Sequence, residues 1–215
     1  MLTLYGQAKS RASRSLWMLE EIGVEYRHVP VRPYTQSRTP DYLRINPNGR
    51  IPSLDDDGFI LWESLAINLY LAQKYAAAPL WPGALQNRAL AYQWSFWAAN
   101  EIEPRIVAIA GALARQTQDQ AAVASPLAEL ASALRVLEQH LGERTHLLGS
   151  DFTVADVNLA SHLREPGEHG VANIAAIDLT PFPNLARWLD GCAERAAVQR
   201  VAARPEVDRA AIGRL

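Results

Sequence analysis

The pattern of hydrophobic and polar positions divides the chain into two regions of different character. Up to about residue 75, short apolar runs typical of strands alternate with helical patterns, and beyond residue 83 only helical patterns remain. Residues 76–83 hold two prolines and a glycine, a composition typical of a domain boundary. We therefore expect a domain of residues 1–78, a linker of residues 79–86 and a second domain of residues 87–215.

The first 31 residues predict a strand, a helix and a second strand. Leu2–Tyr5 forms a short apolar run, and residues 13–22 carry leucine and isoleucine at helical spacing before Gly23, a typical residue after a helix end. Residues 26–31, with Tyr26, Val29 and Val31, are read as the next strand. A strand–helix–strand unit of about 30 residues predicts two parallel strands joined by a crossover helix.

A hairpin and a helix complete the first domain. After a polar stretch at residues 32–45, which predicts an irregular short helix, strands at residues 51–54 and 59–62 flank Asp55–Asp56–Asp57–Gly58. That tetrapeptide is typical of a tight turn, since glycine accepts positive φ. A helix from Glu63 to about Tyr75 gives the element order βαβαββα.

Helical patterns fill the second domain. Residues 88–113 predict a long helix, and a final helix spans about residues 185–201. Between them, Thr153 and Asp156 have the spacing of a capping box, which marks a helix start. A leucine stripe at spacings of three and four marks another amphipathic helix: Leu127, Leu130, Leu134, Leu137 and Leu141. An all-α domain follows from these patterns.

Composition narrows the functional classes. With 215 residues, 49% of them apolar and 20% charged, the chain has the balance of an ordinary globular protein. A net charge of −2 argues against nucleic acid and anionic membranes as partners, and no apolar run reaches about 18 residues. The N-terminus lacks the pattern of a secretory signal, and a single cysteine fits a reducing compartment, so we expect a cytoplasmic protein.

Candidate chemistry gathers around the predicted hairpin. Ile51 precedes Pro52, which favours an extended backbone able to pair with an incoming peptide. Glu63 and Ser64 stand at a predicted helix start, where free N–H groups and the helix dipole attract a carboxylate. Glu63 would meet an ammonium group beside it. These features together predict a receptor for a γ-glutamyl peptide.

This segment resembles the glutathione site of the cytosolic glutathione S-transferase superfamily, in its bacterial serine-type, theta- or beta-like, members. The resemblance implies a thioredoxin-like N-terminal domain with a mixed four-stranded sheet, followed by an all-α C-terminal domain. It also implies a cis bond between Ile51 and Pro52, pairing of Ile51 with the cysteinyl backbone of glutathione, and a γ-glutamyl end held by Glu63 and Ser64. Glutathione would be a co-substrate, with no permanently bound cofactor.

The loop of residues 6–14 is expected to activate the thiol. Glutathione attacks as a thiolate, so an enzyme needs a hydrogen-bond donor for S⁻. By resemblance to serine-type members, Ser10 fills this role, with Ser13 and Arg14 in the matching register. The residues after Ser10 depart from the family, which often has a proline there. Ser13, Tyr5, a backbone amide, or a plain helix-capping role for the serines remain alternatives.

Other ligand contacts are also expected. Arg50 is the candidate for the glycine carboxylate, with Arg38 as an alternative. The resemblance places the hydrophobic electrophile site and a dimer interface on the first helix of the second domain, where we select Trp97, Asn100 and Glu101. A homodimer is therefore expected.

No metal site is expected. His162 and Glu165 have the spacing to share a helix face, but Pro166 and Gly167 end that helix, and no companion pair exists.

The implied activity is that of a glutathione transferase acting on a small hydrophobic electrophile. A non-catalytic glutathione- or ligand-binding homologue remains an alternative, as does a glutathione-dependent peroxidase or isomerase that uses the same site.

Overall fold

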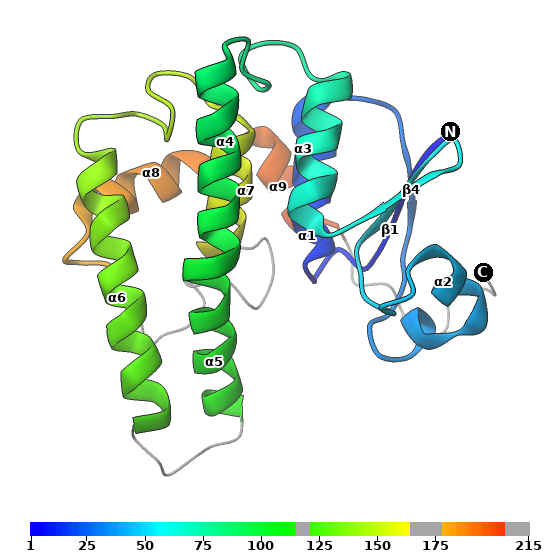
Figure 1. Ribbon diagram of the computed structural model, residues 1–215, viewed down its shortest axis with the longest axis horizontal. Helices are drawn as coiled ribbons and strands as arrows, with labels where there is room; N and C mark the ends of the chain where they lie inside the picture. The colour runs from blue at the N-terminus through cyan, green and yellow to red at the C-terminus, as the bar shows by residue number, and fades with distance from the viewer. Residues whose placement is uncertain (115–120, 164–177, 205–215) are drawn as a thin grey trace. The chain divides into compact units, whose positions relative to one another are not determined.

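The computed structural model describes residues 1–114, 121–163 and 178–204 (Figure 1). Two compact units emerge from the contacts: Met1–Ala77 together with Ala196–Leu215, and Ala78–Arg195. The break after Ala77 falls within the Pro- and Gly-containing stretch. By its contacts, the C-terminal segment groups with the N-terminal residues, whereas the sequence pattern assigned it to the second domain.

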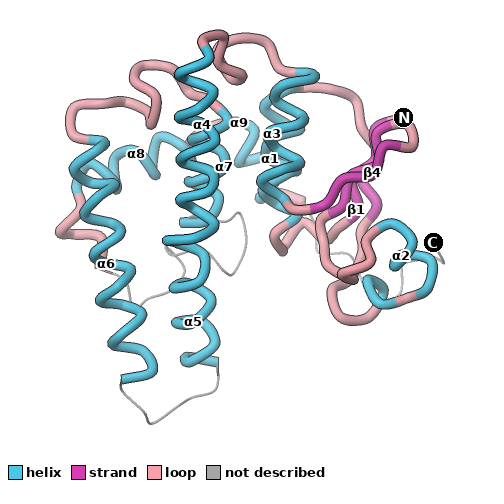
Figure 2. Tube along the Cα trace, viewed as in Figure 1, coloured by secondary structure: helices cyan, strands magenta, loops and turns pink. Residues whose placement is uncertain are grey.

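A mixed four-stranded sheet forms the centre of the first unit (Figure 2). Its strands are β1 (Leu2–Tyr5), β2 (Arg27–Val29), β3 (Ser53–Asp56) and β4 (Phe59–Trp62), in the spatial order β2-β1-β3-β4. β1 pairs with β2 in parallel, and β3 pairs with β1 and β4 in antiparallel orientation. The expected fold class of this unit is confirmed.

The second strand of the hairpin lies where it was predicted, at Phe59–Trp62, whereas the first lies two residues later than predicted, at Ser53–Asp56. Asp56 pairs with Phe59, so the turn consists of Asp57 and Gly58, with φ values of 51° and 91°. A two-residue turn with positive φ at both positions matches the twist of antiparallel strands. The strand begins at Ser53 rather than Ile51, because Pro52 has no N–H to donate to a ladder.

Three α-helices pack together in the first unit. α1 (Ala12–Ile22) ends at Gly23, which takes φ 72° and donates its N–H to the Leu19 carbonyl at 2.9 Å. α1 contacts both α3 (Ser64–Tyr75) and α9 (Ala196–Ala202). The predicted final helix thus divides into two, of which α9 belongs to this unit.

The connection from β2 to β3 contains a 3-10 helix, η1 (Gln36–Arg38), and the short helix α2 (Pro40–Ile45). The Thr39 side chain caps α2 by accepting the Tyr42 N–H. Tyr42 is fully buried in an apolar cluster with Tyr5, Val31 and Ile51. α2 is thereby fixed beside the residues that precede β3.

The regular elements of the second unit are helices, apart from one isolated bridge between His146 and Gly149 in its described residues. Its elements are α4 (Leu85–Trp97), η2 (Ala98–Ile102), α5 (Glu103–Ala114), α6 (Ala121–Leu141), α7 (Val154–Leu163) and α8 (Pro183–Ala193). The long helix predicted at residues 88–113 is interrupted by η2, a π-helical segment. No helix in the described part of the chain is both long and apolar enough to cross a bilayer.

The capping box at the start of α7 is confirmed. The Asp156 carboxylate accepts the Thr153 N–H at 2.9 Å, and Thr153 Oγ1 accepts the Ala155 N–H at 3.2 Å. The other Asp156 oxygen accepts the Leu147 N–H and the Trp188 indole N–H, each at 2.9 Å. Asp156 therefore joins α7 to α8 as well as capping its own helix.

Candidate functional site

The peptide bond between Ile51 and Pro52 is cis, as predicted. It lies immediately before β3, where Ile51 is nearly buried. The main-chain N–H and C=O of Ile51 make no hydrogen bond with any residue that the structure describes. Buried main-chain groups are normally paired, so these two are available to pair with an added extended segment.

The hairpin register brings the predicted ligand-binding residues to one end of the sheet. Ser53 pairs with Trp62. Pro52 and Glu63, the residues next to that pair, therefore lie at the open end of the hairpin, opposite its turn. The cis peptide and the start of α3 thus meet at one edge.

A polar network holds the residues on both sides of Ile51 and Pro52. The Tyr42 hydroxyl donates to the Arg50 carbonyl at 2.8 Å and lies 2.9 Å from the Ser53 hydroxyl. The Asn46 amide donates to the same two oxygens, at 2.9 Å and 3.3 Å. Burial raises the pKa of Tyr42 to about 12, so its hydroxyl remains a donor at neutral pH. Sequence analysis missed both residues, because neither belongs to the ligand-contact pattern.

Two arginines flank this loop. Arg50 has an exposed side chain and a main-chain carbonyl fixed by the network. The Arg38 side chain packs directly against Gly49. A Cβ added to Gly49 would lie 2.8 Å from Arg38 Cδ and 2.9 Å from Arg38 Nη1. Both predicted candidates for a carboxylate therefore lie at the same loop.

Glu63 has an unusual backbone. It takes φ 74° and ψ 112°, a sparsely populated region for a residue with a side chain, and its side chain is exposed. Glu63 stands at the N-cap of α3, yet no side chain caps that helix. The first N–H groups of α3 and the positive end of its dipole are thus available to an anion beside Ser64.

Gly6 lies where three parts of the site meet. A Cβ added to it would lie 2.6 Å from Ala12 Cβ and 3.5 Å from both Ile51 Cβ and Pro52 Cα. Its φ of 149° is also unfavourable for residues with side chains. Only glycine allows the end of β1, the start of α1 and the cis peptide to approach this closely.

Ser10 is half-exposed in the loop that follows Gly6. Its hydroxyl donates to the Gln7 carbonyl at 2.6 Å and accepts the Ala12 N–H at 3.1 Å. The second contact is a helix-capping contact at the start of α1. A hydroxyl has one proton and two lone pairs, so the O–H bond can turn away from Gln7 toward another acceptor while the oxygen still accepts the Ala12 N–H.

The alternatives to Ser10 are buried. Ser13 is fully buried within α1, and its hydroxyl has no hydrogen-bond partner among the described residues, so the capping role considered for it is wrong. Tyr5 packs edge-on against Tyr42, with ring centroids 6.4 Å apart, inside the apolar cluster. Of the three candidate hydroxyl residues, Ser10 is the most open to solvent.

The predicted electrophile contacts lie around the π-helical segment. Trp97 is half-buried at the end of α4, Asn100 is exposed, and Glu101 is half-exposed. Arg105 donates to the Glu101 carbonyl at 2.6 Å and pairs with the Glu101 carboxylate at 3.0 Å. π-Helical turns occur frequently at functional sites. The signal for this one in the sequence is Pro104, which lacks the N–H that an uninterrupted α-helix would donate to Asn100, and the hydrophobic periodicity alone did not include it.

No group of three or more metal-binding side chains occurs among the described residues. His162 is buried; its Nδ1–H donates to the Asn158 carbonyl at 2.7 Å, and its Nε2 lies 3.4 Å from Glu103. Glu165, the partner considered in the sequence, lies outside the described residues.

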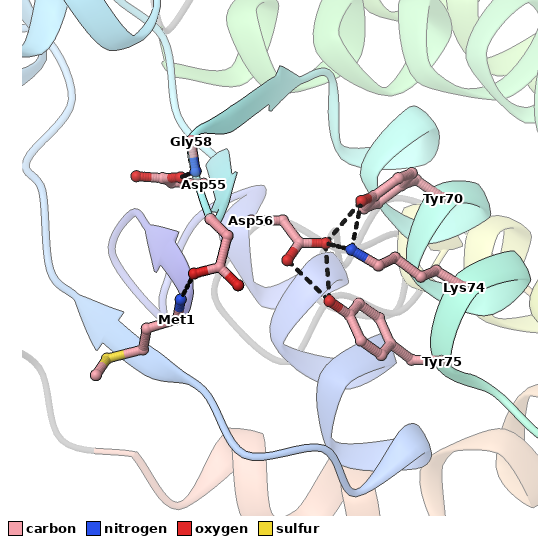
Figure 3. A network of polar contacts seen from close by, with 8 residues as sticks. Met1, Asp55, Asp56, Gly58, Tyr70, Lys74 and Tyr75 are labelled. Atoms are coloured by element: carbon pink, nitrogen blue, oxygen red, sulfur yellow. Dashed lines mark hydrogen bonds and ion pairs between the residues drawn. The ribbon is translucent and has the colours of Figure 1, made fainter.

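A buried carboxylate holds the opposite end of the sheet (Figure 3). Asp56, whose side chain is 2% exposed, accepts hydrogen bonds from Lys74 at 2.5 Å, Tyr70 at 2.6 Å and Tyr75 at 2.8 Å. Burial raises the pKa of Asp56, but these three donors outweigh burial and bring the pKa below its ordinary value. This Asp56 clamp fixes the last turn of α3, and thereby the direction in which its first turn points.

Comparisons with known proteins agree with this geometry. The family description "Glutathione S-transferase, N-terminal domain" matches residues 1–73, and "Glutathione S-transferase, C-terminal domain" matches residues 91–196. The chain is 33% identical over 208 residues to "Glutathione S-transferase GstB" of Escherichia coli strain K12, covering 94% of this chain and 97% of that protein. It is 32% identical to "Glutathione S-transferase 4" of Zea mays, covering 93% and 91%.

Solved structures give the same result. The theta class glutathione S-transferase from Xanthomonas axonopodis pv. citri, with glutathione bound, superimposes with a TM-score of 0.81 at 28% identity, covering 95% of this chain and 98% of that chain. A glutathione transferase family member from Pseudomonas fluorescens, with two glutathione bound, gives 0.84 at 27% identity, covering 95% and 93%. The chain therefore belongs to the glutathione S-transferase family, whose activity is glutathione transfer.

Proposed function

We propose that this transferase holds glutathione along Ile51, Pro52, Glu63 and Ser64 and stabilises the glutathione thiolate with Ser10. The observation that carries the proposal is the unpaired main chain of Ile51 at the same edge as the uncapped start of α3. These two features match the two ends of a γ-glutamyl-cysteinyl unit.

Each end of glutathione has a complementary group. The cysteinyl N–H and C=O pair with the main chain of Ile51, and the γ-glutamyl carboxylate accepts N–H groups of α3 beside Ser64. Glu63 meets the ammonium group. Arg50, exposed at the loop held by Tyr42 and Asn46, receives the glycine carboxylate.

The Ser10 hydroxyl keeps its proton and donates a hydrogen bond to the sulfur as the thiol loses its own proton to solvent. Lowering the thiol pKa by two units corresponds to about 2.7 kcal/mol. One charge-assisted hydrogen bond and the start of α1 together supply an effect of that size. The thiolate then forms a bond to carbon of the electrophile, and a leaving group, where there is one, departs with the bonding electrons.

Replacing Ser10 tests the assignment. Ser10→Ala should raise the pKa of the bound thiol by about one to two units and lower turnover at neutral pH about ten- to a hundredfold, with little change in glutathione affinity. Ser13→Ala and Tyr5→Phe are matched controls that remove a nearby hydroxyl. A pH–rate profile that shifts for one of the controls, and stays fixed for Ser10→Ala, transfers the role to that residue.

We propose Trp97, Asn100 and Glu101 as the contacts of a small hydrophobic electrophile. The proposal is supported by the exposure of these three side chains, which is partial for Trp97 and Glu101, at the π-helical segment. Trp97→Ala should lower kcat/KM for an aryl halide while leaving the thiol pKa unchanged. A hydroperoxide and an isomerisable substrate in the same assay distinguish transfer from peroxidase and isomerase activity, and an inert enzyme that retains glutathione indicates a binding homologue.

A homodimer is proposed from the exposed apolar residues of α4. Leu85 is 76% exposed and Phe96 65% exposed, and Tyr92 lies on the same helix face between them. A second copy would cover these side chains. Light scattering at micromolar concentration should give twice the chain mass, and Phe96→Glu should shift the protein toward monomer.

The finer classification is part of the same proposal. Ser10 makes the chain a serine-type, theta- or beta-like, transferase. Residues 1–78 bind glutathione, and residues 79–86 connect the two domains, although α4 already begins at Leu85. Residues 87–215, except α9, contribute the electrophile contacts and most of the dimer surface. A cytoplasmic location fits the single cysteine, Cys192, which is buried and free.

A further inference from the structure

His28 on β2 connects the C-terminal helix region to the loop that carries Ser10. Its Nε2 lies 2.7 Å from the Gly6 carbonyl, and its Nδ1 lies 3.3 Å from Arg204 Nη1. The Gly6 N–H donates to the Val29 carbonyl at 2.9 Å. Both main-chain polar groups of Gly6 are therefore held by β2, one of them by a side chain.

The two contacts determine the protonation of the ring. A carbonyl only accepts, so Nε2 carries a proton; an arginine only donates, so Nδ1 carries none. Burial lowers the pKa of His28, the hydrogen bond to Gly6 opposes this, and the charge of Arg204 lowers it further. The ring is neutral at pH 7, and Arg204 selects the tautomer that binds Gly6.

Arg204 is itself held firmly. Its Nη2 donates to Glu20 Oε1 at 2.6 Å and to the Tyr26 hydroxyl. Tyr26 donates to the same Glu20 oxygen at 2.8 Å. Glu20, Tyr26 and Arg204 are thus the charged and titratable groups that surround the His28 contact, and they come from α1, from the residue before β2 and from the residues after α9.

Gly6 is the position where this network can affect chemistry. It packs against Ile51, Pro52 and the first residue of α1, and the Ser10 loop begins directly after it. We propose that His28 is a positioning residue: by holding the Gly6 carbonyl it fixes the loop that keeps the Ser10 hydroxyl within reach of the thiol, and Arg204 keeps His28 in the required tautomer. This inference rests on the proposed role of Ser10.

The test compares two replacements of His28. His28→Leu removes the donor, whereas His28→Gln places an amide N–H near the position of Nε2 and does not titrate. We expect His28→Leu to raise the pKa of bound glutathione by about one unit, a tenfold loss of thiolate below that pKa, with glutathione affinity within about threefold. His28→Gln should stay within about 0.3 unit of the parent. If His28→Leu lowers the melting temperature but leaves the thiol pKa unchanged, His28 contributes to stability alone. That result would overturn the proposal.

A matched pair in the C-terminal segment provides the control. Arg200 also binds Glu20, through its Nε at 2.6 Å, and among the described residues it does not contact His28. Arg204→Met should raise the thiol pKa, by less than His28→Leu does, and Arg200→Met should leave it unchanged. Equal shifts in both variants would show that only anchoring of α9 matters and would overturn the role of the His28 contact, even where His28→Leu fails to fold.

The double variant separates this inference from the proposed function. If His28 acts through Ser10, His28→Leu adds no further pKa shift in a Ser10→Ala background. A shift with Ser10→Ala and none with His28→Leu overturns the positioning role alone. No shift with Ser10→Ala overturns the assignment of Ser10, whatever His28→Leu does.

Discussion

The two ends of the β3–β4 hairpin are held in opposite ways. At the turn end, the Asp56 carboxylate has three donors, all from the last turns of α3. At the open end, the main chain of Ile51 is unpaired among the described residues, and Glu63 takes a strained backbone at a helix start that no side chain caps. The polar groups at the turn end are thus bonded to one another and make that end rigid, whereas those at the open end remain available to a ligand.

The largest expected effect, a loss of stability, comes from removing the Asp56 carboxylate at the turn end of the hairpin. Asp56→Ala leaves two tyrosine hydroxyls and Lys74 without their acceptor, and should lower the free energy of unfolding by about 2–3 kcal/mol. Urea denaturation measures this change. Because the clamp lies away from the ligand, the thiol pKa of the folded variant should equal that of the parent, and a shift would mean that the two ends are not independent.

Substitution at the open end should instead change glutathione binding more than it lowers stability. Glu63→Ala and Glu63→Gly both remove the carboxylate and should weaken glutathione binding about tenfold, or about 1.4 kcal/mol. Glycine also relieves the positive φ, so Glu63→Gly should be about 1 kcal/mol more stable than Glu63→Ala. Calorimetric titration and chemical denaturation supply the two numbers. Equal stability of the two variants would show that the Glu63 backbone stores no strain.

The contribution of Asp56 to stability should also depend on pH in the acid range. Its pKa is lowered in the folded protein, so its contribution to stability is complete above the ordinary value of 3.8 and is lost as pH falls through the folded pKa. The parent should therefore lose stability below pH 3.8 more steeply than Asp56→Asn does. Parallel stability curves for the two proteins in this range would contradict the clamp.

The smallest effect is expected at Ser13. A cap lost at this position would cost about 1 kcal/mol, but its buried hydroxyl has no partner among the described residues. Ser13→Ala should thus change the free energy of unfolding by less than about 0.5 kcal/mol. A larger loss on denaturation would show that the hydroxyl does form a hydrogen bond.

Local signals in the sequence predicted what local chemistry determines. β1, the end of α1 at Gly23, the cis bond at Pro52 and the capping box at Thr153 each depend on residues adjacent in the chain or on a recognisable motif. The Asp56 clamp joins residues 14 to 19 positions apart, and the Arg204–His28 contact joins residues 176 apart. Such partners have no periodicity to reveal them.

The interruption of the long helix escaped prediction for a different reason. Pro104, two residues after η2, has no N–H to donate to the Asn100 carbonyl and so disturbs the α-helical hydrogen bonds there, but the hydrophobic periodicity that predicted the helix does not register a proline. Among the site residues, Ser10 was favoured by register alone, and its greater exposure compared with Ser13 and Tyr5 became known only from the fold.

The docking of α9 against α1 has a consequence for how the protein is made. The sheet and α1 leave the ribosome first, while Glu20 and His28 receive their arginine partners only when residues 200–204 have been synthesised. At about 5–20 residues per second, that delay after residue 77 is on the order of 10 s. The nascent N-terminal unit therefore waits, incompletely closed, for residues 200–204, and a message that ended before codon 200 would yield a transferase whose first-made residues never acquire these contacts.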